Sequence, residues 1–138
     1  HAQEAIDSDQ ETAGDGGWVF RRSWGGEGDF IHSPSGIAIG NDGRMYVSST
    51  ELNRILIISE DDTIKSFGSL GVGPGQFTRP GEIAIGPNNT LYIIDSMHRR
   101  IQGFDMNGNF LYMWGNRGNE PGQFEWPQGI AINSEGFV

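Results

Sequence analysis

Short runs of alternating apolar and polar residues, separated by turn residues, occupy much of the chain. In the first complete stretch these runs lie at 36–40, 45–49, 54–59 and 63–67. Asn41-Asp42-Gly43 separates the first two runs and Asp61-Asp62 the last two, and such residues tolerate the positive φ angles of tight hairpins. Each run has the length of one strand and the alternation of a half-buried strand. The pattern therefore predicts four antiparallel strands.

The same pattern recurs with a period of about 47 residues. A Gly-x-Phe segment ends at positions separated by 47 residues, namely Phe30, Phe77 and Phe124. A Pro-x-x-Ile-Ala-Ile segment recurs at spacings of 46 and 47 residues, beginning at Pro34, Pro80 and Pro127. Alignment of the copies predicts further strands at 18–24, 82–86, 90–95, 100–105, 109–114 and 129–133.

Copies of one four-stranded unit must stack, because a sheet of about 45 residues cannot bury both of its faces alone. Radial stacking gives a β-propeller, so the fold class predicted is all-β, with blades of four antiparallel strands. The expected organisation is an acidic N-terminal arm at 1–17, followed by an incomplete propeller at 18–138. Its parts are an outer strand at 18–24, a blade at 34–68, a blade at 80–115 and a partial blade at 127–138.

These repeats resemble the NHL-repeat family of β-propellers. The best match spans residues 71–115, where the family pattern is met at Pro80, Ile83, Ala84, Tyr92, Asp95, Arg100, Ile101, Phe104, Gly108, Phe110, Trp114 and Gly115. The first copy departs from the pattern with Ser49 in place of Asp. The position that is Asn in the family carries Leu52 in the first copy and His98 in the second.

The resemblance implies a ring that typically has six blades, which would need about 280 residues at 47 residues per blade. We therefore expect the 138 residues to be the N-terminal part of a longer propeller; self-association of half-rings is the alternative. Function does not follow from the resemblance, because such propellers include RNA binders, protein-binding scaffolds and enzymes.

Composition and charge narrow the classes of partner. The chain contains 22 Gly and 6 Pro, too many for long helices. The net charge of the chain is −9, and residues 1–17 hold five acidic residues without Lys or Arg. Binding to a nucleic-acid backbone requires clustered positive charge, and this excess of acidic residues argues against it. The chain has no Cys, and its longest aliphatic run, 55–58, is far shorter than the roughly 20 residues that span a bilayer. We predict neither a nucleic-acid partner nor a membrane span.

In propellers, ligands usually meet the face built by the loops between strands two and three and between one blade and the next. In this chain those loops carry side chains of mixed charge, which suit protein contact better than phosphate binding. The candidates for a binding face are His32, Arg79, Glu82, His98, Arg99, Arg117 and Trp126. Glu82 replaces a glycine of the other copies, and its carboxylate is expected at the central channel or on a solvated rim.

Three charged residues are predicted to be structural. Asp95 and Arg100 recur in the family, and we expect an ion pair that joins blades or fixes a turn, with Arg54 as the equivalent of Arg100 in the first copy. His32 and His98 lack the spacing of a metal site and are expected to be surface loop residues.

No Ser-His-Asp set, phosphate loop or pair of carboxylates is evident in the sequence. The amidating lyases of this fold hold zinc with histidines directly after the proline that opens a blade, and the corresponding residues here are Ser35, Gly81 and Gln128. We therefore predict no catalytic residue, no metal ligand and no cofactor.

The favoured function is a non-catalytic protein-interaction or scaffold module, an accessory subunit of a larger assembly. Its expected partner is a protein, or the remaining blades of the same propeller. The alternative is a metal-dependent hydrolase or lyase, with a divalent metal on the propeller axis and its site completed by residues beyond 138. An uncovered blade face and strand edge also predict that residues 1–138 alone aggregate or form oligomers.

The first residues bear on location. His1-Ala2-Gln3 is an unusual natural start and fits the product of signal cleavage, with a tag residue or an arbitrary truncation as alternatives. A periplasmic or extracellular protein is therefore expected.

Overall fold

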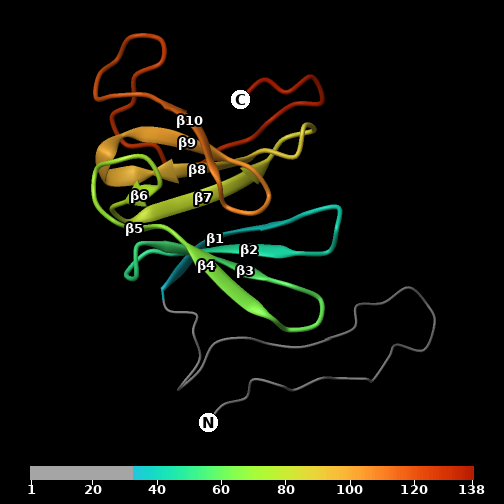
Figure 1. Cartoon of the computed structure of the whole chain (residues 1–138). Coiled ribbons are helices and arrows are strands. Elements are labelled where there is room, and N and C mark those ends of the chain that lie inside the picture. Colours follow the sequence, from blue (N-terminus) through green and yellow to red (C-terminus); the bar gives the residue numbers. More distant parts are fainter. Residues whose placement is uncertain (1–32) are drawn as a thin grey trace, which may run out of the picture. The chain divides into compact units, whose positions relative to one another are not determined.

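The computed structural model describes residues 33–138, whose main elements are two four-stranded antiparallel sheets (Figure 1). The first sheet has the order β1-β2-β3-β4, with strands at Pro34–Ile39, Met45–Ser49, Arg54–Ile58 and Ile64–Phe67. The second has the order β10-β9-β8-β7, and its strands in chain order are Pro80–Ile85, Leu91–Asp95, Arg100–Phe104 and Phe110–Trp114.

The all-β fold predicted from the repeats is confirmed, and the bounds of these eight strands lie within two residues of the predicted ones. The predicted strand 18–24, the acidic arm 1–17 and His32 lie outside the described residues. No helix within 33–138 has the length and apolar character needed to cross a membrane.

Turn residues fix the hairpins, as their chemistry predicts. Gly43 (φ 86°) and Gly108 (φ 89°) adopt the left-handed conformation that glycine takes without steric cost. In the second sheet, Asp105 Oδ1 accepts hydrogen bonds from the backbone N–H groups of Asn107 and Asn109, both at 2.9 Å. This side chain closes the β9–β10 turn in the manner of an Asx turn.

Residues 68–79 join the two sheets and contain a short parallel pair, β5 (Ser69–Leu70) and β6 (Gln76–Phe77). A single-turn 3₁₀ helix, η1 (Ser96–His98), connects β8 to β9. Neither feature is predicted by the alternating pattern, because both are too short to carry a period. The connection matters to the core because it delivers Phe77, which is fully buried.

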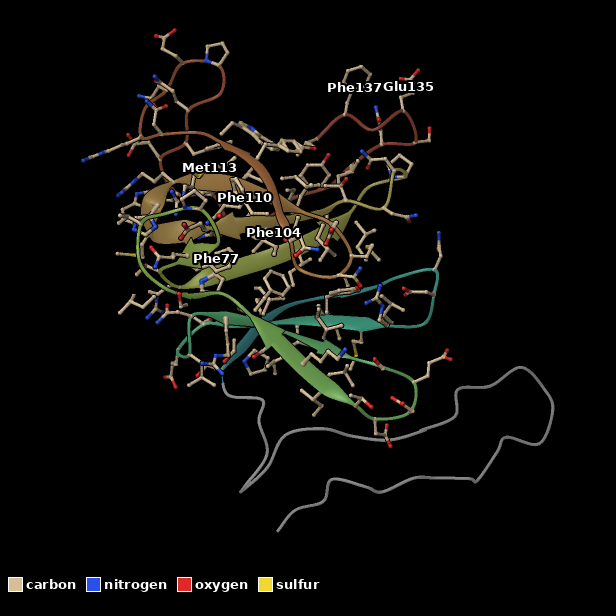
Figure 2. All side chains as sticks on the ribbon, viewed as in Figure 1. Phe77, Phe104, Phe110, Met113, Glu135 and Phe137 are labelled. Atoms are coloured by element: carbon tan, nitrogen blue, oxygen red, sulfur yellow. The ribbon has the colours of Figure 1, made fainter. Side chains whose placement is uncertain are left out.

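The hydrophobic core lies between the two sheets. Its buried members are Tyr46, Ile55, Ile57, Phe77, Ile83, Leu91, Ile93 and Phe104. The Phe104 ring lies 4.9 Å from the ring of Phe67 and 5.7 Å from that of Phe77, measured between centroids. Figure 2 shows Phe77 and Phe104 in this region. One core therefore includes β4, β9 and the connection between the sheets.

The inner strands β1 and β7 approach closely at Gly36. A Cβ atom built there would lie 2.6 Å from the carbonyl oxygen of Gly81 and 2.7 Å from the Cα of Glu82. Both are backbone atoms, so a side chain at Gly36 must push the strands apart.

Gly36→Ala is accordingly expected to lower the free energy of unfolding by about 1–3 kcal/mol, the usual cost of overpacking. The matched control is Gly129→Ala, whose Cβ would meet a Glu82 carboxylate oxygen at 3.1 Å, the mobile end of a side chain. Urea unfolding of both variants checks the difference. Equal effects would contradict a backbone contact between β1 and β7.

The prediction of a strand at 129–133 within the partial blade 127–138 is wrong. The turn that follows does form, since Asn133 N–H donates to the carbonyl of Phe137 at 3.0 Å and Gly136 N–H to that of Asn133 at 3.0 Å. No strand is assigned to residues 127–138. A strand needs a continuous ladder with a partner, and none of the described strands forms such a ladder with residues 129–133.

Candidate functional site

A buried polar network surrounds Asp95 at the end of β8. Its Oδ1 accepts a hydrogen bond from the backbone N–H of Thr78 at 3.0 Å. Its Oδ2 accepts from Arg100 Nε at 2.7 Å and Gln102 Nε2 at 3.2 Å, and lies 2.9 Å from His98 Nδ1. Asp95 is fully buried. The structure thus contains the ion pair between Asp95 and Arg100, here spanning the β8–β9 connection.

Arg100 also clamps the connection between the sheets. Its guanidinium donates to the carbonyls of Val72 at 2.8 Å, Gly73 at 3.2 Å and Gln76 at 3.0 Å. These bonds hold the carbonyl groups of a segment that lies mostly outside the strands, since Val72 and Gly73 belong to none. The network therefore fixes the segment that leads into Arg79 and β7.

Arg54 occupies the equivalent place in the first sheet. It pairs with Ser49 across β2 and β3, as Arg100 pairs with Asp95 across β8 and β9. Because position 49 is a serine, the carboxylate of the Asp95–Arg100 pair has no counterpart there. Arg54 is exposed, whereas Arg100 is buried.

Three of the predicted binding-face residues come together beside the end of η1. Arg99 Nε donates to the carbonyl of Glu125 at 2.9 Å, and its guanidinium lies 4.6 Å from the centroid of the Trp126 ring. Arg117 Nε lies 3.6 Å from Glu125 Oε1. Trp126 is 65% exposed. We call Arg99, Arg117, Glu125 and Trp126 the Trp126 cluster.

The contact that builds this cluster has an equivalent one repeat earlier. Asn53 and Arg99 occupy matching loop positions, with φ angles of 55° and 52°. Asn53 Oδ1 accepts a hydrogen bond from the backbone N–H of Arg79 at 2.8 Å. In both cases a left-handed loop residue reaches the segment before the next blade-opening proline. In the second copy the contact is made by the charged side chain of Arg99, which also lies over the aromatic ring of Trp126.

His98 does not join the Trp126 cluster. Its Nδ1 is held by Asp95, and its side chain is 24% exposed. The residue stands where the repeat pattern has an amide, and here the imidazole supplies a nitrogen to the buried carboxylate. It is therefore part of the buried network and not the surface loop histidine expected from the sequence.

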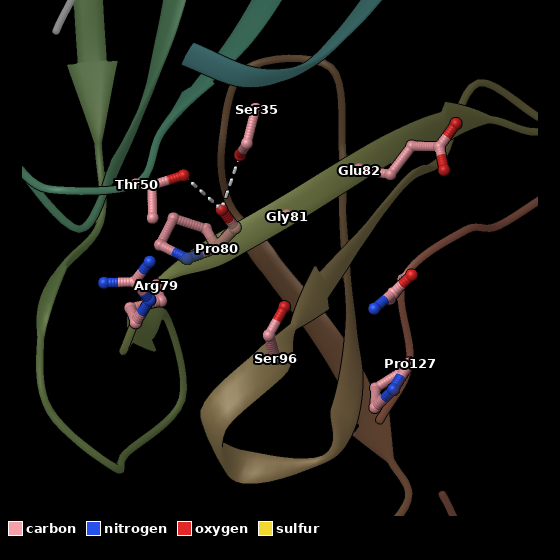
Figure 3. A pocket seen from close by; sticks show the side chains of 9 residues that line it. Ser35, Thr50, Arg79, Pro80, Gly81, Glu82, Ser96 and Pro127 are labelled. Atoms are coloured by element: carbon pink, nitrogen blue, oxygen red, sulfur yellow. Dashed lines mark hydrogen bonds between the residues drawn. The ribbon is translucent and has the colours of Figure 1, made fainter. Parts of the chain in front are cut away.

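Arg79 and Glu82 lie in a separate cleft of about 400 Å³ at the start of β7 (Figure 3). We call it the Pro80 cleft, and it is lined by Ser35, Thr50, Arg79, Pro80, Gly81, Glu82, Ser96, Pro127 and Gln128. Sequence reasoning did not select the hydroxyl groups of this lining as site residues. The signal was present, however: Ser35, Gly81 and Gln128 each follow a blade-opening proline, and all three meet here.

The chemistry of the lining differs from that of a zinc site. It offers one carboxylate, several hydroxyl groups and one amide, and no imidazole or thiolate, which are the common ligands of zinc. Within residues 33–138, no group of three or more His, Cys, Asp or Glu side chains is placed to hold a metal. The cleft is thus suited to hydrogen bonding and charge pairing.

Comparison with known families accounts for the repeated sheets. Residues 29–115 match a family model described as 6-bladed beta-propeller. The chain belongs to this family. The two sheets are therefore consecutive blades, and the NHL-like propeller predicted from the repeats is confirmed.

Relatives of the propeller include proteins much longer than this chain. Protein brain tumor of Drosophila melanogaster is 36% identical over 66 residues, 48% of this chain and 6% of that protein. B-box type zinc finger protein ncl-1 of Caenorhabditis elegans is 39% identical over 46 residues, 33% of this chain and 5% of that protein. Peptidyl-glycine alpha-amidating monooxygenase B of Xenopus laevis is 26% identical over 113 residues, 74% of this chain and 13% of that protein.

Solved structures show the same fold. A virginiamycin B lyase from Staphylococcus aureus matches with a TM-score of 0.58 and 18% identity, over 75% of this chain and 32% of that chain. A streptogramin B lyase matches with a TM-score of 0.50 and 23% identity, over 59% of this chain and 26% of that chain. At these identities the likeness concerns the arrangement of strands alone.

Proposed function

We propose that this propeller segment is a non-catalytic protein-interaction module, and that the Trp126 cluster is part of its contact surface. The observation that carries the proposal is an exposed tryptophan held in place by an arginine stacked on its ring. Trp and Arg are enriched among the residues that dominate binding energy at protein interfaces. Because Arg99 is itself bonded to the Glu125 carbonyl, the pair is ordered before a partner arrives, which lowers the entropic cost of binding.

The surroundings of the cluster support a protein partner over a polyanion. Glu125 lies beside Arg117, so the charges of the surface are mixed. A phosphate backbone requires clustered positive charge. The similarity to segments of Protein brain tumor and of ncl-1 supports a module that serves within a larger protein or assembly.

Selection of a displayed peptide library on the full chain tests this proposal. Peptides that bind the wild type are expected to lose at least tenfold in affinity on Trp126→Ala and on Arg99→Ala, because truncating a central interface residue costs about 2 kcal/mol or more. Phe137→Ala is the matched control, since Phe137 is an aromatic residue with a similar exposure of 69%. Unchanged affinity on both variants, or equal loss on the control, would contradict a role for the cluster.

A second candidate function rests on Glu82, a half-buried carboxylate in the Pro80 cleft. In a metal-dependent hydrolase or lyase of this fold, such a group would act with ligands from further blades. Elemental analysis of the native full-length protein distinguishes the two. A stoichiometric divalent metal that is lost in Glu82→Gln would favour the enzyme over the interaction module.

A further inference from the structure

The Pro80 cleft contains two opposite charges that are not paired with each other. Arg79 donates its backbone N–H to Asn53 Oδ1. The Arg79 guanidinium makes no hydrogen bond or ion pair within the described residues. The Glu82 carboxylate accepts one long hydrogen bond, from the backbone N–H of Ile130 at 3.3 Å. Figure 3 shows the two side chains toward opposite ends of the cleft. Both charges are therefore available to a ligand.

An irregularity of β7 places both side chains in the same cleft. In a regular strand, residues three apart point to opposite faces of the sheet. The pairing of β7 with β8 shifts between Pro80, opposite Asp95, and Ile83, opposite Ile93, so one extra residue is inserted. A bulge of this kind re-aims a side chain. Arg79, just before the strand, has a left-handed φ of 59°.

The neighbouring blade holds this irregular backbone in place. Ser35 Oγ and Thr50 Oγ1 both donate to the Pro80 carbonyl, at 2.8 and 3.2 Å (Figure 3). Ser48 Oγ donates to the Gly81 carbonyl at 2.6 Å. These bonds give the Pro80 and Gly81 carbonyl groups partners in the first blade, beyond the β7–β8 pairing. The backbone between Arg79 and Glu82 is thus held by side chains of the first blade.

Neutral polar groups complete the lining. The Ser96 hydroxyl and the Gln128 amide border the cleft, and neither has a hydrogen-bond partner within residues 33–138. The volume of about 400 Å³ falls within the range of small-molecule sites. The cleft therefore offers a cation, an anion and neutral hydrogen-bonding groups to a ligand of modest size.

We propose that the Pro80 cleft binds a short peptide in its zwitterionic form, with the terminal carboxylate on Arg79 and the terminal ammonium group on Glu82. The planar guanidinium matches a carboxylate in two parallel hydrogen bonds. Three residue steps separate the two α-carbons by at most about 10 Å, and the side chains extend toward opposite ends of the cleft, which suits a peptide of two or three residues. Its amide groups would face Ser96 and Gln128.

Other ligand classes fit the two charges less well. A phosphate group on Arg79 would be repelled by Glu82, because both are negative. A neutral sugar could donate to Glu82 and accept from Arg79, but without an opposite charge these hydrogen bonds are weaker than those of a zwitterion. This inference goes beyond the interaction surface proposed above, because it involves none of the residues of the Trp126 cluster.

Four forms of one peptide test the proposal by isothermal titration of the full chain. The probes are Ala-Ala-Ala, its N-acetyl form, its C-terminal amide, and the form blocked at both ends. The zwitterion is expected to bind at least tenfold more tightly than either singly charged form, and the doubly blocked form least. Equal affinity for all four probes, or no saturable binding of the zwitterion, would overturn the proposal.

Charge-neutral variants assign each end of the ligand. Arg79→Gln is expected to weaken binding of the zwitterion and of the N-acetyl form, which carry the carboxylate, and to leave binding of the amide unchanged. Glu82→Gln is expected to weaken binding of the zwitterion and of the amide, which carry the ammonium group, and to leave binding of the N-acetyl form unchanged. Lys65→Gln and Glu135→Gln are controls, since both residues are exposed and outside the cleft. If the Arg79→Gln, Glu82→Gln double variant still bound the zwitterion more tightly than the three blocked forms, the assignment would be overturned. If the zwitterion does not bind but Trp126→Ala still abolishes binding of the selected peptides, the proposal for the cleft is wrong and the proposed interaction module stands.

Discussion

Asp95→Ala is expected to lower the free energy of unfolding by about 3–5 kcal/mol, because it removes the counter-charge of a buried arginine. The substitution leaves Arg100 with its carbonyl contacts but without the carboxylate at 2.7 Å. It also leaves the Thr78 N–H without its acceptor and removes one of the two acceptors of the Gln102 amide, which keeps the Gln76 carbonyl. Urea unfolding, followed by circular dichroism, measures the loss.

Two comparisons separate the buried charge from a general effect of losing an aspartate. Asp42→Ala breaks an exposed pair with Arg44 of similar length, 2.8 Å, and is expected to cost about 0–1 kcal/mol. Asp95→Asn combined with Arg100→Met removes both charges and should recover part of the stability lost in Asp95→Ala. A loss in Asp95→Ala no larger than that in Asp42→Ala would contradict the importance of this network.

The network also connects stability to the two candidate sites. Arg100 holds the segment from Val72 to Gln76, and Asp95 holds Thr78, the residue before Arg79. His98 and Arg99 follow Asp95 in the β8–β9 connection. Loss of Asp95 is therefore expected to disturb the Pro80 cleft and the Trp126 cluster together, although neither includes Asp95.

The two sheets were predictable from sequence because each hairpin depends on local chemistry. Gly43 and Asp105 act within a few residues of their own position, and the alternation within a strand sets its buried face. The 47-residue period then shows that each copy repeats the same unit. The strand expected at 129–133 does not form. The turn after it needs only local residues, whereas a strand also needs a neighbouring strand to pair with.

The sites were less predictable because they depend on contacts between repeats, at positions where the copies differ. Asn53 and Arg99 are equivalent, but one bonds to a backbone N–H and the other stacks on Trp126. The sequence identifies Trp126 and Arg99 as loop residues without showing that they touch. The bulge in β7, which turns Glu82 into the Pro80 cleft, likewise leaves no periodic signal.

Phe104→Ala is expected to cost about 3–5 kcal/mol, the usual range for removing a fully buried phenylalanine. Phe104 is 1% exposed, and its ring contacts Phe67 of β4, Phe77 of the connection and Phe110 of β10. The cavity would therefore open where the two blades share a core. Urea unfolding measures the loss, and amide hydrogen exchange shows which strands lose protection.

The pattern of exchange decides whether the two blades are one cooperative unit. Because Phe104 contacts both sheets, protection is expected to fall in β3 and β4 as well as in β8 and β9. Phe137→Ala provides the control: this phenylalanine is 69% exposed, and its removal should change stability by no more than about 0.5 kcal/mol. Loss of protection confined to the second sheet would mean that each blade is stable by itself, contrary to the shared core. If both sheets respond, packing between blades stabilises the structure that carries the cleft and the cluster.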